Sequence, residues 1–430
     1  MKKIWNWYLH LPRTVRFETT GVVLFFLCFI FGQLGRMTLS PTVVLYPHDV
    51  IIVLWLVTHL KADKTLVERG WIWLTKHPLT AVTLAWVALG LIWGVINHFQ
   101  LRPLLMVARL TAYFMFAFQI GQFFKARRVE LRLMMVITGI GALWLGLLQY
   151  LFIPDTRFLS ILGWDDHYYR LIGTLFDPNY MGMFIILVML YTISLQWLIP
   201  KKFMVGLQAI FVGLLAVTYS RASYATAGLT ALLLAATPFP LKKWNIHQRV
   251  GLGLTVLLTF SLVLYTAPKP GGEGVKLLRT SSIEARQSTT LQTMEALSSI
   301  DVIIGRGLFS NLLTSNTDPK VPQHAQVPDN VLVLLLSGTG VIGTVLILAS
   351  LIYWIGQLAG RETALAIALS ATLLHAQFNN TLFEPFISVY LLLALLAPLD
   401  QTQMLYTRRH HFRAKPNSHS TKHQEKKSNV

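Results

Sequence analysis

Charged residues are scarce in this sequence, and acidic residues are the scarcest among them. Charged side chains make up 13% of the 430 residues and hydrophobic ones 54%, whereas soluble domains carry about 25% charged residues. Long apolar runs extend through most of the chain. This deficit excludes a soluble globular protein and predicts a polytopic membrane protein.

The sequence has only one cysteine and no ATP-binding loop. The single cysteine, Cys28, lies in the first hydrophobic run, so the sequence offers no disulfide framework. It contains no Walker A loop and no detectable internal repeat, so nothing in it indicates ATP-driven transport. The formal net charge of +18 lies largely in short connectors and the tail, which predicts contact with membrane lipid and no nucleic-acid partner.

The apolar runs predict about twelve membrane spans, because roughly 20 apolar residues cross the hydrocarbon layer. The tenth span can break at Ser337-Gly338-Thr339-Gly340. Four basic residues precede the first apolar run, which is too long for a signal-peptide core and is interpreted as a retained helix. The predicted spans are 17–35, 43–60, 79–97, 104–124, 131–153, 179–199, 203–219, 223–240, 250–267, 330–358, 362–380 and 386–405.

Lysine and arginine predict the orientation, because both accumulate in cytoplasmic connectors. Most of the 37 such residues face the cytoplasm if the N-terminus does. Both termini are then cytoplasmic, and the long polar loop faces the periplasm or the extracellular space. The predicted division is a membrane domain (1–267), this outer loop domain (268–329), a second membrane region (330–405) and a basic, disordered tail (406–430).

The outer loop has features typical of an anion site. Arginine outnumbers lysine on the predicted outer side, and guanidinium groups bind phosphate bidentately. Ser281-Ser282-Ile283-Glu284 is typical of a capping box and predicts one helix that bears Arg286 and ends at Gly305-Arg306-Gly307. That helix would carry four apolar residues on one side, namely Leu291, Met294, Leu297 and Ile300.

Two other arginines lie beside predicted spans. Arg170 precedes Asp177-Pro178-Asn179, a turn that can cap a helix, although an ordinary junction between loop and span explains it equally well. Arg221 follows Ser220 in a connector so short that its side chain must lie at the membrane boundary. Arg221 at this depth indicates either a functional site or a side chain that snorkels to lipid phosphate. For Arg286, the alternative to an anion-binding role is a place on a solvated basic face of the helix.

Acceptor activation would need a base near the outer surface. His324 and Asp329 precede the tenth span and are candidates, although a surface histidine and a helix N-cap are the alternatives. Several polar residues within or beside spans are expected to pair between helices or to shape a site: His48, Asp49, Arg109, Gln119, His375 and Glu384.

Together these motifs resemble the O-antigen ligase and O-antigen polymerase family of bacterial envelope glycosyltransferases. The likeness covers most of the chain and rests on the order of its motifs. They are the Arg170–Gly182 stretch, the Ser220-Arg221 pair, an outer loop with an arginine-bearing helix, the Gly305-Arg306-Gly307 turn and Asp329-Asn330 before a Gly-x-x-Gly span.

The resemblance implies an all-α membrane glycosyltransferase of the C-type fold class, in the bacterial cytoplasmic membrane, with no metal and no cofactor. Such enzymes move a glycan from undecaprenyl diphosphate to a hydroxyl of lipid A core, of another glycan or of a protein. Arg170, Arg221 and Arg286 match the arginines that hold the diphosphate. Three residues are expected in support, namely Asn179, Asn330 and Arg306.

One position departs from the family pattern. Family members usually have His-Asn where this chain has Asp329-Asn330, so the resemblance leaves either Asp329 or His324 as the base. It also leaves ligase and polymerase unresolved. The main alternative is a transporter or flippase for lipid-linked glycans, which predicts repeated halves and charged residues at mid-membrane.

Overall fold

The computed structural model describes residues 13–40, 43–62, 65–98, 101–125, 127–237, 244–270, 274–277, 281–310 and 328–396. These residues are mostly helical, as predicted. A helix lies in each of the twelve stretches predicted to span the membrane. They are α2 (Arg13–Ile30), α3 (Pro47–Ala62), α5 (Pro78–His98), α6 (Leu101–Phe123), α7 (Arg128–Phe152), α8 (Pro178–Ser194), α9 (Lys201–Ala216), α10 (Arg221–Ala236), α11 (Ile246–Thr266), α14 (Val331–Arg361), α15 (Thr363–His375) and α16 (Pro385–Leu396).

The length and apolar character of these helices are those of a membrane-embedded protein. Within the described ranges, five helices are long and apolar enough to cross a membrane, namely α5, α6, α7, α11 and α14. That all twelve cross it stays a prediction. One further helix, α4 (Thr65–Thr75), lies in a connector where no helix was expected.

A short antiparallel hairpin lies where the second predicted span was expected to begin as a helix. Strands β1 (Met37–Ser40) and β2 (Val43–Leu45) pair with Met37 opposite Leu45 and Thr38 opposite Val44. The second helix therefore begins at Pro47, later than predicted. β-branched residues favour the extended backbone before it, and proline suits the first turn of a helix.

The tenth predicted span breaks where its sequence indicated. Gly340 lies inside α14 with φ 65° and ψ −177°, a backbone conformation that only glycine adopts easily. The kink leaves carbonyls to be satisfied, and the Ser337 and Gly338 oxygens accept hydrogen bonds from the Arg306 and Gly307 amides at 2.9 and 3.0 Å. The turn at 305–307 thus packs directly into the kink.

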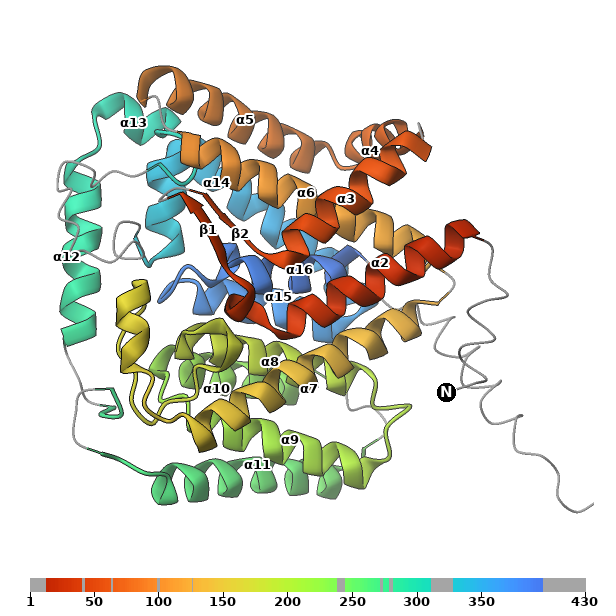
Figure 1. Cartoon of the computed structure of the whole chain (residues 1–430), viewed down its shortest axis with the longest axis vertical. Helices are drawn as coiled ribbons and strands as arrows, with labels where there is room; N and C mark the ends of the chain where they lie inside the picture. The colour runs from red at the N-terminus through yellow and green to blue at the C-terminus, as the bar shows by residue number, and fades with distance from the viewer. Residues whose placement is uncertain are drawn as a thin grey trace, which may run out of the picture.

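The outer-loop helix is two helices, not the single one expected. α12 (Ser281–Glu295) ends early, and a second capping box between Ser298 and Asp301 begins α13 (Ser299–Ile304). The apolar stripe does not pack inward, since Leu291 and Met294 are exposed. Figure 1 shows α12 at one side of the bundle, running across the ends of longer helices, with α4 on the opposite side.

Candidate functional site

A cavity of about 120 Å³ brings together residues from three separate parts of the chain. Four predicted site residues line it: Arg170, Arg221, Arg286 and Asn179. The remaining lining comes from Asp165, His167, Asp177 and Ala222. Three arginines against two aspartates leave the lining net positive, and the volume has room for several waters or one small anionic group.

Arg170 is built into the wall of this cavity. Its side chain is buried, and its Nε donates to the Thr218 carbonyl at 3.0 Å while Nη2 donates to the Tyr219 carbonyl at 3.4 Å. Gln149 fixes the same loop, because its Oε1 accepts from the Ile172 and Gly173 amides at 3.1 Å each. Arg170 therefore joins the loop before α8 to the turn between α9 and α10.

Arg221 occupies the first position of α10. Ser220 caps this helix by accepting from the Ser223 amide, so the local sequence fixes where Arg221 leaves the backbone. The guanidinium is half-buried, and its Nη1 donates to the Leu277 carbonyl at 3.3 Å. A short segment of the outer loop, 274–277, thus lies against the cavity.

Arg286 and Asp329 form an ion pair across the outer loop. Arg286 Nε lies 3.0 Å from Asp329 Oδ2, and the two side chains are 30% and 35% exposed. Asn330, rather than Asp329, caps α14 by accepting from the Leu332 and Val333 amides. The pair ties α12 to the start of α14, so Asp329 serves here as a partner for a guanidinium.

A buried polar network forms the floor beneath Asn179. Asn179 Oδ1 accepts from Ser220 Oγ at 2.7 Å, and Ser223 Oγ lies 2.8 Å from Ser220 Oγ and 3.0 Å from His375 Nε2. His375 Nδ1 in turn lies 2.7 Å from Thr381 Oγ1. This network connects α8, α10 and α15, so Asn179 and His375 position the site together.

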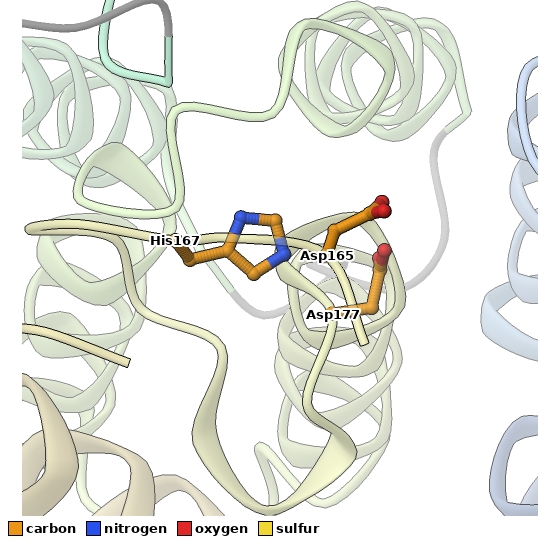
Figure 2. A group of neighbouring side chains, drawn as sticks. All are labelled: Asp165, His167 and Asp177. Carbon is orange, nitrogen blue, oxygen red and sulfur yellow. The ribbon is translucent and has the colours of Figure 1, made fainter. Parts of the chain in front are cut away.

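The acidic side of the cavity was missed from sequence. Ligand atoms of Asp165, His167 and Asp177 all lie within 4.8 Å of one another, and Figure 2 shows a ring nitrogen of His167 directed toward the two carboxylates. Three ligand atoms this close together could coordinate a divalent cation. It would also face three guanidinium groups, and Arg170 Nη1 lies 3.5 Å from His167 Nδ1. This charge balance argues against a cation, and we assign none.

Backbone strain is concentrated beside the cavity. Of the four non-glycine residues with positive φ in the described part of the chain, Tyr169 precedes Arg170, Phe176 precedes Asp177 and Tyr219 lies two residues before Arg221. Such conformations cost about 1–3 kcal/mol each and cluster at functional sites. All three strained residues thus lie within two positions of a charged residue that lines the cavity.

Other predicted residues lie elsewhere. Arg306 is not among the cavity-lining residues; its Nε lies 2.7 Å from Asp301 Oδ2, and it also bonds the Ala296 carbonyl. His324 and the tail (406–430) fall outside the described residues. The internal pairing predicted for Arg109 is confirmed, because its Nη2 lies 3.0 Å from Asp49 Oδ2.

Glu384, between η5 (Thr381–Phe383) and α16, gives a test of pH dependence. Burial raises the pKa of this carboxyl from 4.5 to about 8, while the Ile387 amide donates to Oε2 at 2.8 Å. A raised folded-state pKa means that the folded protein binds this proton more tightly. Its contribution to stability is therefore full below about 4.5 and is lost as the pH rises through about 8.

We expect Glu384→Gln to flatten this dependence, because glutamine keeps an acceptor for Ile387 and cannot ionise. Thermal unfolding of the detergent-solubilised full chain across this pH window measures the slope. The variant should lose less stability than the wild type as the pH rises. Equal slopes in the two proteins would show that Glu384 does not titrate in this range.

The arrangement is suited to binding an anion and moving a proton. Guanidinium groups supply fixed donors for phosphate oxygens, and nearby carboxylates supply proton acceptors. Arg170, Arg221, Arg286 and Asn179 lie together, as the sequence motifs predicted, whereas Arg306 does not line the cavity. No protein-family model matches this chain, and no significant match to it exists among curated proteins.

Proposed function

We propose that this protein is a membrane glycosyltransferase that moves a glycan from undecaprenyl diphosphate to an acceptor hydroxyl. The observation that carries the proposal is that three arginines from distant segments line one cavity: Arg170, Arg221 and Arg286. A diphosphate is the ligand that such a set of guanidinium groups suits best. The acceptor would be lipid A core, a second lipid-linked glycan or a protein.

The proposed reaction needs little more than positioning and charge. As the bond between the anomeric carbon and the diphosphate breaks, negative charge accumulates on the phosphate oxygens. Arg221 and Arg286 are half-buried and would meet that charge with preorganised donors. Arg170 would hold the turn between α9 and α10, from which Arg221 projects, through its contacts to the Thr218 and Tyr219 carbonyls.

The proposed location follows from the distribution of basic residues. The cavity residues lie near the start of α8, α10 and α12, in connectors that the lysine and arginine pattern assigns to the outer side. We propose the bacterial cytoplasmic membrane, with both termini in the cytoplasm and the cavity facing outward. No nucleotide, metal or other cofactor takes part in the proposed reaction.

The product common to every variant of this reaction is free undecaprenyl diphosphate. We expect the full chain, reconstituted in vesicles with lipid-linked glycan and acceptors extracted from membranes of the source cells, to release it. Vesicles without the protein provide the control. Movement of intact lipid-linked glycan between leaflets, without release of undecaprenyl diphosphate, would contradict the proposal and favour the transporter.

A further inference from the structure

Transfer to a hydroxyl requires a group that removes its proton, and the cavity limits the candidates. Asp329 is paired with Arg286 at 3.0 Å, and a carboxylate held by a guanidinium is a weaker base. His167 Nδ1 lies 3.5 Å from Arg170 Nη1, a donor, and a ring nitrogen of His167 is directed toward the Asp165 and Asp177 carboxylates (Figure 2), so the imidazole lies among charged groups of the wall. Asp165 is exposed to solvent, so its carboxylate is not held in place beside an acceptor hydroxyl.

Asp177 differs from these residues in how its two oxygens are used. Oδ1 caps α8 by accepting from the Asn179 and Tyr180 amides at 2.7 and 2.9 Å. Both of these bonds go to the same oxygen, which leaves Oδ2 as the atom for other chemistry. The carboxylate is fixed by the cap, lines the cavity and shares it with Arg221 and Arg286.

Resting on the function proposed above, we infer that Asp177 is the catalytic base that accepts the proton of the acceptor hydroxyl. The acceptor oxygen forms a bond to the anomeric carbon as its proton passes to Asp177 Oδ2. The bond from that carbon to the diphosphate oxygen breaks, and its electron pair stays on the diphosphate, beside Arg221 and Arg286. No further reactant is needed, and the proton later returns to solvent.

The surroundings of Asp177 suit this role. Its pKa is raised above the ordinary value, mainly by burial, because burial and the neighbouring Asp165 carboxylate outweigh the opposing effects of the Tyr180 and Asn179 amides and of Arg170. A carboxyl with a raised pKa is a stronger base than one exposed to water. The His167 imidazole lies beside both carboxylates (Figure 2), and its Nδ1 lies 3.5 Å from Arg170 Nη1. The preceding Phe176 has φ 57° and sets the direction in which Asp177 leaves the chain.

The helix cap makes an unusually clean test possible. Asn and Ser are both good N-cap residues, so Asp177→Asn and Asp177→Ser keep an acceptor for the α8 amides and remove only the base. We expect either variant to release undecaprenyl diphosphate about 10²–10⁴-fold more slowly, which is the usual contribution of a general base. Binding of undecaprenyl diphosphate itself, measured with the pure lipid, should not weaken, because both variants remove a negative charge from the cavity that holds the diphosphate.

Asp155→Asn is the matched control, because Asp155 is partly exposed, pairs with Arg157 at 2.6 Å and does not line the cavity. It should keep the wild-type rate. Full release by Asp177→Asn, or a larger loss in Asp329→Asn than in Asp177→Asn, would overturn the assignment of Asp177. If the wild type released nothing, the proposed function itself would fail, which is a separate result.

Discussion

Replacing Arg221 or Arg286 with alanine is expected to slow release of undecaprenyl diphosphate by about 10²–10³-fold, the usual loss when one donor to a developing oxyanion is removed. Both guanidinium groups are half-buried, and both line the cavity. Arg221 begins α10 with its side chain directed to the Leu277 carbonyl, and Arg286 reaches Asp329. Neither is part of the hydrophobic core, so both variants should still insert and fold.

Charge and geometry can be separated with further variants. Arg221→Lys keeps a cation but loses the planar fork, and we expect a rate between those of arginine and alanine. Arg157→Ala is the control for loss of a guanidinium, because this side chain is 57% exposed and lies outside the cavity. Wild-type rates in both Arg221→Ala and Arg286→Ala would remove the diphosphate role.

Arg170 shows what the sequence could not distinguish. The motifs match it to a diphosphate ligand, like Arg221 and Arg286, because all three are arginines in motifs on the predicted outer side. In the structure it is only 6% exposed and donates to the Thr218 and Tyr219 carbonyls. Whether an arginine binds a ligand or positions a turn depends on which carbonyls lie within its reach, and those belong to a segment 48 residues away.

Local sequence predicted the helices well and their partners poorly. Apolar runs and glycines act within a few turns, so the positions of the helices and the break near Gly340 could be foreseen. The hairpin at Met37–Leu45 could not, because its strands are too short to show an alternating pattern. The pair between Arg286 and Asp329 depends on how the outer loop folds back on α14.

The sequence around Asp165, His167 and Asp177 contains a local signal for a polar site. Two acidic residues and a histidine occur at 165–167, in a chain where charge is scarce and directly before Arg170. Their concentration in one connector indicated a polar site there. The sequence around Asp177 indicates only a helix cap, which it is, whereas the cavity that its carboxylate lines is formed by segments distant in sequence.

A buried ion pair lies at the ends of α7 and α8 that are opposite the cavity. Arg132 and Glu362 are each 1% exposed, and Arg132 Nη1 lies 3.2 Å from Glu362 Oε1. Arg132 also donates to Ser194 Oγ at 3.2 Å, and its guanidinium lies 5.0 Å from the centre of the Tyr191 ring. The pair links the start of α7 to the junction of α14 and α15, which are 230 residues apart in sequence.

Glu362→Ala is expected to destabilise the protein by about 3–5 kcal/mol, because it leaves the Arg132 charge buried without its main partner. The double variant Arg132→Met with Glu362→Leu removes both charges, and we expect it to recover most of that loss, since apolar replacements of buried pairs are often neutral. Unfolding of the solubilised full chain measures both effects. Equal losses in the single and double variants would show that lost packing, not an uncompensated charge, sets the cost.

This pair lies at the opposite end of α7 and α8 from the cavity. The double variant should therefore keep the wild-type release rate, which separates the stability of the bundle from its chemistry.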